Sequence, residues 1–304
     1  MPDHRPFSPL NVKDQPLVSL LMPSYNSEEF IGEAIESVIA STYQNWELIV
    51  VDDLSKDRTL EIARSYEAKD SRIKVYLNEK NEGDYPNRNV AASYAKGKYI
   101  KYIDHDDAIY YWGLEVEVEM MERFPEAGYG LDSIAQDDEQ IFPYMLSPEE
   151  TYRQHYLEKR GLFDKAPTSC IINREVFIKE GEFAPIKSSG DYDMWHRLSM
   201  KYPLVVMPHG IIWSRYHAGS ESAKTFISYS RLYQYQAIAR RSLENPQCPL
   251  PEMVKGKLIN KVRLIQVKLI TKCLLHLRFD ELKAIKKWEP LSLGRMLWLQ
   301  LIGR

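Results

Sequence analysis

The sequence predicts an α/β fold in which a mostly parallel sheet carries flanking helices and a helical extension follows at the C-terminus. Over the first hundred residues, four short apolar runs rich in β-branched and aromatic residues alternate with helical patterns. Strand, helix and strand repeated in this order favour parallel pairing through right-handed crossovers. In the last third of the chain the pattern changes to long, basic helical periods.

The elements of the first hundred residues follow from this alternation. Strands are expected over 17–25, 46–53, 72–78 and 98–104, and the helices between them over 30–40, 58–68 and 86–96. Asn26 with Glu29 predicts a capping pair for the first helix, and Asp57 a cap for the second. Pro86 is expected to open the third helix and Gly97 to close it.

Length and composition are those of an ordinary globular protein. The 304 residues are 44% hydrophobic and 27% charged, which excludes a disordered chain and allows one large domain with an appendage, or two domains. Cys170, Cys248 and Cys273 lie far apart without a C-x-x-C spacing, so neither a zinc site nor a disulfide framework is predicted, and a cytoplasmic setting is expected. The first 16 residues lack the apolar core of a signal peptide, and no run of about 18 apolar residues predicts a membrane span.

Charge is distributed unevenly along the chain. The net charge is −3, but the segment from Val254 to Arg304 holds 12 Lys and Arg against 3 Asp and Glu, a net +9 that leaves −12 for the rest. A basic, amphipathic C-terminal region is compatible with an anionic membrane surface, and also with packing on the acidic body or with a dimer contact. Nucleic-acid binding is not expected, because no recognition motif accompanies the charge.

Acidic residues end the second and the fourth expected strand. Asp52 and Asp53 follow the second strand, and Asp104, Asp106 and Asp107 follow the fourth. In an open α/β sheet, ligands bind at these carboxyl ends. Carboxylates alone would repel phosphates, whereas Mg²⁺ or Mn²⁺ bridges carboxylate and diphosphate oxygens. Taken alone, such an acidic triplet is more often a solvated turn, and the glycine-rich loops of dinucleotide- and triphosphate-binding folds are absent.

Several motifs in order resemble the family 2 glycosyltransferases. "MPSYN" (22–26) and "VDDLSKD" (51–57) match the turns after the first two strands, and "NEG" (81–83), "RN" (88–89) and "AKGKYIKYIDHDD" (95–107) match the segment that ends in D-x-D-D. The resemblance covers about residues 16–222. It implies the GT-A fold, with a Rossmann-like nucleotide-binding half over about 16–107 and an acceptor half over about 108–222. Residues 1–15 then form an N-terminal extension and residues 223–304 a basic helical region.

The resemblance assigns roles in the first half. It implies a nucleotide-binding set made of Pro23, Tyr25, Asn26, Asp52, Asp53, Asn81, Gly83, Arg88 and Asp104. An aspartate at 52 or 53 can accept a hydrogen bond from the imide N–H of uracil or thymine, although the same pair would also serve as a turn and a helix cap. Asp106 is implied as the metal ligand, Asp104 as a contact to the metal, its water or the ribose, and Asp107 as a structural acid; His105 matches no residue of the family.

The second half carries the implied catalytic base. "GDYDMWHRL" (190–198) resembles the family's helix that opens on this base, which places the base at Asp191. Gly190 stands where the family commonly has a glutamate, so Asp193 remains the alternative, and an aspartate that only caps the helix is the structural reading. "SRYHAGSES" (214–222) resembles the closing motif, which makes His217 a third metal ligand and Arg215 and Ser220 contacts to the diphosphate.

Together these matches imply an inverting, metal-dependent glycosyltransferase of the hexosyltransferase type. It would move a sugar from a nucleotide sugar, with a UDP-sugar preferred, to a hydroxyl of a glycan or lipid-linked acceptor in cell-surface polysaccharide synthesis, in the cytoplasm or at the inner face of the membrane. Asp191 would take the proton of the hydroxyl, and Mn²⁺ or Mg²⁺ would stabilise the leaving diphosphate. The alternatives are a non-catalytic scaffold that binds nucleotide sugar or glycan and, less favoured, a nucleotidyltransferase. A scaffold needs no base, and a nucleotidyltransferase needs a glycine-rich loop that is missing after the first strand.

Overall fold

The computed structural model describes residues 15–217 and 228–288, which belong to two compact units. The first unit comprises Met1–Ser147, Lys165–Pro185 and Tyr202–Arg215, and the second comprises Pro148–Asp164, Ile186–Lys201 and Tyr216–Arg304. Segments far apart in the sequence therefore share a unit. The domain boundaries at 15/16 and 222/223 stay predictions, and residue 222 lies outside the described residues.

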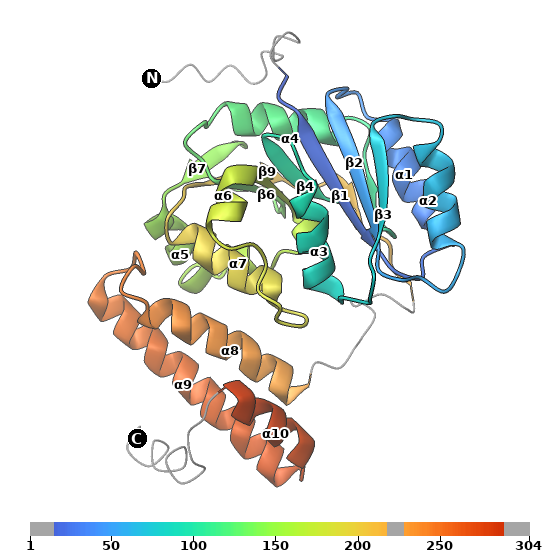
Figure 1. The fold of residues 1–304 in the computed structure, drawn as a ribbon. Helices are drawn as coiled ribbons and strands as arrows, with labels where there is room; N and C mark the ends of the chain where they lie inside the picture. Colours follow the sequence, from blue (N-terminus) through green and yellow to red (C-terminus); the bar gives the residue numbers. More distant parts are fainter. Residues whose placement is uncertain (1–14, 218–227, 289–304) are drawn as a thin grey trace, which may run out of the picture. The chain divides into compact units, whose positions relative to one another are not determined.

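The first unit is built on an eight-stranded sheet with the order β3-β2-β1-β4-β8-β6-β9-β7 (Figure 1). The strands are β1 (Val18–Ser24), β2 (Trp46–Asp52), β3 (Ile73–Leu77), β4 (Tyr99–Tyr102), β6 (Tyr129–Ile134), β7 (Tyr144–Leu146), β8 (Cys170–Asn173) and β9 (Leu204–Pro208). The first four strands pair in parallel, as does β6 with β9, whereas β8 runs antiparallel to both neighbours and β7 to β9. The prediction of a mostly parallel α/β sheet is confirmed.

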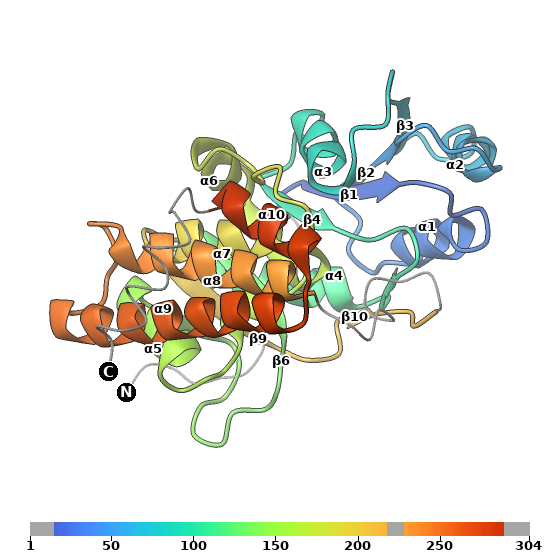
Figure 2. The ribbon, with the colours of Figure 1, turned by 90° about the horizontal axis from the view of Figure 1, so that it is seen from below.

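Helices cover both faces of this sheet. They are α1 (Ile31–Ile39), α2 (Thr59–Glu67), α3 (Asp84–Ser93), α4 (Gly113–Glu122) and α6 (Arg174–Lys179). Figure 2 shows α3 and α6 on one side of the strands and α1 and α4 on the other. Every residue of β1 is buried, as is typical of a central strand covered on both faces.

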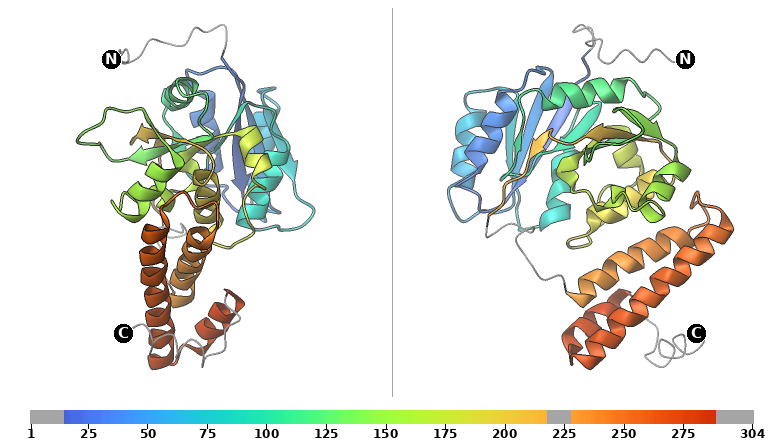
Figure 3. Two further views of the ribbon diagram at one scale, coloured as in Figure 1. Left: turned by 90° about the vertical axis from the view of Figure 1, so that its left-hand side faces the viewer. Right: turned by 180° about the vertical axis from the view of Figure 1, so that it is seen from behind.

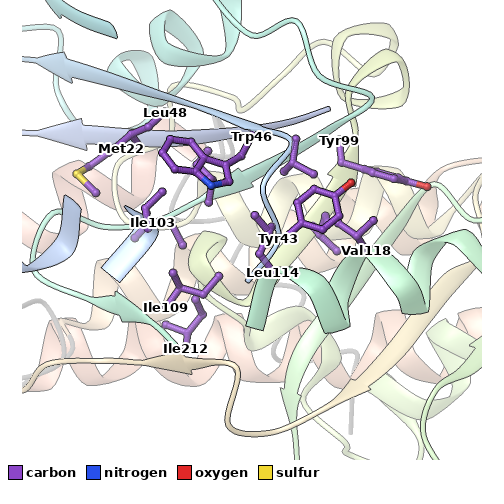
Figure 4. Packing of buried hydrophobic residues seen from close by; sticks show 14 of the residues in the cluster. Met22, Tyr43, Trp46, Leu48, Tyr99, Ile103, Ile109, Leu114, Val118 and Ile212 are labelled. Carbon is purple, nitrogen blue, oxygen red and sulfur yellow. The ribbon is translucent and has the colours of Figure 1, made fainter. Parts of the chain in front are cut away.

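Large side chains fill the layer between the sheet and α1 and α4 (Figure 4). Trp46, Leu48 and Met22 reach it from the strands, and Leu114 and Val118 from α4. The short strands β5 (Ala108–Ile109) and β10 (Ile212–Trp213) pair antiparallel and contribute two isoleucines to the same core. This pairing fixes the chain directly after the acidic triplet.

The starts of two helices differ from the prediction. Asn26 does not cap α1, which begins at Ile31 without a side-chain cap, because Asn26 bonds to the chain after β2 instead. The helix α3 begins at Asp84 rather than at Pro86, because Gly83 already turns the chain with a φ of 85°. Gly97 does not close α3 either: a Cβ there would lie 2.7 Å from the backbone O of Leu17, so glycine is required by close approach to the chain entering β1.

A buried ion cluster joins β4, α4 and β6. The Lys101 ammonium donates to Glu117 Oε1 at 2.5 Å, to Asp132 Oδ2 at 2.9 Å and to the backbone O of Thr168 at 2.7 Å. All three charged side chains are fully buried. Two carboxylates face one ammonium in this cluster. Burial raises the pKa of Glu117 to about 8; the charge of Lys101 opposes this rise and the charge of Asp132 adds to it. The three donor positions of the ammonium are therefore filled, and the cluster is close to neutral when Glu117 holds a proton.

This cluster predicts that stability falls as the pH rises from about 4.5 to about 8. The folded pKa of Glu117 is about 8 against an ordinary value of 4.5, so between these values the folded chain binds one more proton than the unfolded chain. Urea unfolding across this window measures the slope. Glu117→Gln should give a flatter dependence than the native chain, and equal slopes for the two would show that Glu117 is ionised when buried.

The second unit is helical. It contains α5 (Pro148–Tyr156), α7 (Gly190–Ser199), α8 (Tyr229–Glu244), α9 (Glu252–Leu275) and α10 (Phe279–Trp288), with a 3-10 turn at Leu162–Asp164. α8 and α9 lie antiparallel, and α10 packs on both through Tyr233, Ile270, Cys273 and Ile285 (Figures 1 and 3). Among the described residues, no helix has the length and apolar character needed to cross a bilayer.

Candidate functional site

The turns after β1 and β2 are tied together at the carboxyl edge of the sheet. Asn26 has a φ of 48°, its Oδ1 accepts from the backbone N–H of Lys56 at 2.8 Å, and its own N–H donates to Ser55 Oγ at 2.9 Å. Asn tolerates this left-handed backbone better than most residues. Pro23 lies in β1 beside Val51 of β2, and Tyr25 is 42% exposed next to Asn26. Three of the predicted nucleotide-binding residues thus line one turn.

The two aspartates at the end of β2 have different surroundings. Asp53 accepts hydrogen bonds from Asn78 Nδ2 (2.7 Å) and from the backbone N–H groups of Glu82 (2.8 Å) and Gly83 (2.9 Å), and its backbone O accepts from Asn81. Its carboxylate therefore holds the 78–83 loop. Asp52 Oδ1 accepts from the N–H of Ser55 at 2.9 Å, whereas Asp52 Oδ2 is buried and has no hydrogen-bond partner among the described residues. A buried carboxylate oxygen of this kind fits a ligand that brings an N–H.

Arg88 links α3 to the end of β4. Its side chain is 8% exposed, with Nη2 2.7 Å from Asp104 Oδ1 and Nε 2.8 Å from Asp84 Oδ1. Burial works against its charge, but Asp104 and Asp84 together hold the pKa of Arg88 well above its usual value. Arg88 therefore stays a cation and offsets one charge of the acidic triplet.

The acidic triplet is compact. One carboxylate oxygen from each of Asp104, Asp106 and Asp107 lies within 4.8 Å of the others. Asp107 Oδ1 accepts from the N–H of Arg215 at 2.9 Å, and Oδ2 accepts from Ser214 Oγ at 3.3 Å. Burial, and then the charge of Asp104, raise the pKa of Asp107 to about 7. Carboxylate oxygens at this spacing fit Mg²⁺ or Mn²⁺. Asp107 already accepts hydrogen bonds from the 214–215 segment, so its carboxylate is not available as a simple metal ligand.

Arg215 is held over the same edge. Its Nε donates to the backbone O of Asp106 at 3.0 Å, its Nη2 lies 2.6 Å from Glu33 Oε2, and its guanidinium lies over the rings of Phe30 and Trp213. A guanidinium fixed beside the carboxylate triplet is suited to a phosphate group. Sequence reasoning did not single out Glu33, Asp84 or Ser214 as partners. Glu33 and Ser214 lie far along the chain from the residues that they contact, and Asp84 belongs to none of the motifs.

The predicted base lies in the second unit, on the first turn of α7. Asp191 Oδ1 accepts from the N–H of Tyr192 at 2.7 Å, and a carboxylate in this position is favoured by the helix dipole. Asp193 instead pairs with Arg197 one turn later, at 2.7 Å. The helix is anchored by His196, whose Nε2 lies 2.6 Å from Tyr156 Oη, and burial lowers the pKa of His196 to about 3.

The closing motif is only partly described. His217 is the last described residue before the gap, and Ser220 lies outside the described residues. Their roles as metal ligand and diphosphate contact stay predictions.

Comparison with known proteins decides the family. A family model described as "Glycosyl transferase family 2" matches residues 19–181, which is more than half of the chain. The chain belongs to this family. The predicted resemblance to the family 2 glycosyltransferases is therefore confirmed.

Relatives of this family 2 glycosyltransferase include two bacterial proteins that are themselves named as glycosyltransferases. WfgD of Escherichia coli, named a UDP-Glc:alpha-D-GlcNAc-diphosphoundecaprenol beta-1,3-glucosyltransferase, is 31% identical over 77% of this chain and 89% of its own. TuaG of Bacillus subtilis, provisionally named a teichuronic acid biosynthesis glycosyltransferase, is 40% identical over 44% of this chain and 54% of its own. The match thus spans about half of TuaG.

Solved structures confirm the GT-A fold of this glycosyltransferase. S. aureus TarS 1-349 in complex with UDP-GlcNAc gives a TM-score of 0.66 at 18% identity, over 93% of this chain and 87% of that one. The Pyrobaculum calidifontis mannosyltransferase PcManGT, in complex with GDP-Man and Mn²⁺, gives 0.62 at 15% identity, over 99% and 83%. At these identities the likeness concerns the fold.

Proposed function

We propose that this family 2 glycosyltransferase transfers a hexose from a UDP-sugar, with inversion, to a hydroxyl of a glycan or lipid-linked acceptor in cell-surface polysaccharide synthesis. The observation that carries the proposal is the joint arrangement at the carboxyl edge of the sheet: a buried oxygen on Asp52 that has no partner within residues 15–217 and 228–288, a compact carboxylate triplet, and Arg215 fixed beside it. The name of WfgD supports both the UDP donor and the lipid diphosphate acceptor.

Within this proposal, Asp52 rather than Asp53 recognises the base. The carboxylate of Asp53 is occupied by the 78–83 loop, so its part is to shape the wall that Asn81 and Gly83 form. Asp52 Oδ2 is available for the imide N–H of uracil. Cytosine has no N–H at this ring position, whereas thymine has the same imide N–H as uracil, so the UDP donor in the name of WfgD is what favours uridine nucleotides.

Asp106, Asp104 and His217 would hold Mn²⁺ or Mg²⁺, which neutralises charge on the leaving diphosphate when bound. Arg88 orients Asp104 through their 2.7 Å contact, and Arg215 supplies positive charge to the phosphate oxygens. Asp191, which the sequence motif places at the position of the base, would accept the proton of the attacking hydroxyl.

Removing the implied metal ligand should remove metal dependence. In Asp106→Asn, the gain in transfer rate on adding Mn²⁺ should fall by about 10²-fold or more, because several kcal/mol of charge stabilisation is lost. Asp138→Asn, at an exposed aspartate of the same unit, is the matched control and should keep the gain. Unchanged Mn²⁺ activation in Asp106→Asn would remove this residue from the metal site.

A calorimetric panel of UDP-, GDP-, dTDP- and CDP-sugars with Mn²⁺, followed by hydrolysis assays, tests the proposed function. UDP-sugars should bind and be turned over, and Asp52→Asn should reduce their binding. Donor binding without any turnover would favour the non-catalytic scaffold, and no binding would end the proposal.

Two contacts of the C-terminal helices are compatible with the reaction, one with an anionic membrane on the cytoplasmic side and one with a second copy of the chain.

A further inference from the structure

Apolar residues occupy two opposite faces of α9. The inner face carries Leu258, Val262, Leu269, Ile270 and Cys273, all buried, and the last three pack in one cluster with residues of α8 and α10. On the outer face, Met253 is 74% exposed, Leu264 49% and Leu275 73%. These three residues are spaced by 11, which is about three helical turns, so they form one line along the helix. Leu277 and Phe279 continue the exposed apolar surface into the turn that follows.

Lysines accompany this line with the same spacing. Lys257 and Lys268 lie four residues after Met253 and Leu264, and Lys261 lies beside them; all three lysines are exposed and form no ion pair within the described part of the chain. From residue 253 to residue 279 the sequence holds seven Lys and Arg and no Asp or Glu, and three of the seven, Lys255, Arg263 and Arg278, pair with acids outside this stretch. The outer face therefore combines a line of exposed hydrocarbon with a uniform positive charge.

The charge selects the partner of this outer face, defined by Met253, Lys257, Lys261, Leu264, Lys268 and Leu275. A symmetric contact with a second copy would place these lysines against one another without an acid on the same face to offset them. A solvated helix face would not need three exposed large apolar side chains in a line. An anionic bilayer meets both requirements, because its headgroups attract the lysines and its acyl boundary accepts the apolar side chains.

We propose that the outer face of α9 docks on an anionic lipid bilayer, with the helix lying along the membrane surface. Docking would hold the chain at the membrane, where a lipid-linked acceptor is presented. This consequence of docking rests on the proposed function. The contact itself depends only on the second unit, so it can fail or hold independently of sugar transfer.

Vesicle flotation of the full chain tests the docking. The chain should float with vesicles of phosphatidylglycerol and phosphatidylcholine in equal parts, should not float with phosphatidylcholine alone, and should be released by salt. The triple variant Lys257→Gln, Lys261→Gln, Lys268→Gln should lower binding about 100-fold, since each cation near the surface contributes about 1 kcal/mol. Glutamine matches the helix propensity of lysine, so α9 should be retained. The control removes three exposed lysines elsewhere, Lys69, Lys74 and Lys96, and should bind normally.

The apolar line has its own variant. Leu264→Gln with Leu275→Gln should weaken binding in low salt as well, because hydrocarbon insertion does not depend on screening. Equal binding to both vesicle types would overturn the docking, and so would normal vesicle binding by the triple lysine variant. The docking would also be overturned if the native chain bound no vesicles and these variants instead lost self-association. Hydrolysis of the donor in solution separates the two proposals: vesicle binding without hydrolysis contradicts the proposed function, and hydrolysis without vesicle binding contradicts the docking.

Discussion

Asp191→Asn should lower the transfer rate by about 10²- to 10⁴-fold while the dissociation constant of the donor changes little. Asn keeps the shape of the side chain on the first turn of α7 but cannot accept the proton of the acceptor hydroxyl. Product formation under saturating donor, together with calorimetric titration of the donor, separates the two effects. Loss of rate with intact donor binding is the pattern expected when a group acts only in the chemical step.

Asp193→Asn is the matched control for this prediction. Asp193 lies two residues further along the same helix, and its carboxylate is paired with Arg197 at 2.7 Å. Removing this partly exposed pair should cost at most about 1 kcal/mol of stability and leave the rate close to normal. If Asp193→Asn lost the rate and Asp191→Asn kept it, the base would be Asp193. If both variants were fully active, neither aspartate would be the base.

Lys101→Met should destabilise the folded chain by about 3 to 5 kcal/mol, enough to unfold many domains of this size. Methionine fits the volume, but it leaves Glu117 and Asp132 buried without their shared cation. Because Lys101 lies on β4, three residues before Asp104, a weakened cluster should also loosen the strand that delivers the acidic triplet. Urea unfolding followed by circular dichroism measures the loss.

Lys98→Met provides the comparison on the neighbouring turn. Lys98 forms an ion pair with Glu122, but the Lys98 side chain is 43% exposed, so solvent screens the pair and its loss should cost under about 1 kcal/mol. Similar midpoints for the two variants would show that the buried cluster adds no more than a surface pair. Partial recovery in Lys101→Met combined with Glu117→Gln and Asp132→Asn would identify uncompensated charge as the cause of the loss.

Much of the fold was predictable because the signals are local. The strands β1 to β4 were placed within a residue or two, since each is a short apolar run, and the helices between them carry their own period. The wrong cap at Asn26 and the early start of α3 have one cause. Both depend on contacts between turns about 30 residues apart, which bring the ends of β1, β2 and the 78–83 loop together.

The sequence by itself determined the α/β class, the order of the motifs and the set of acidic residues at the strand ends, because spacing along the chain carries this information. Only the tertiary structure decided how those residues divide their work. It assigned Asp53 to the loop, left one oxygen of Asp52 without a partner among the residues described, tied Asp107 to Ser214 and Arg215, and buried Lys101 between two carboxylates. Hydrogen bonding and desolvation act between atoms that are neighbours in space, and the partners named here lie 16 to 108 residues apart in the sequence.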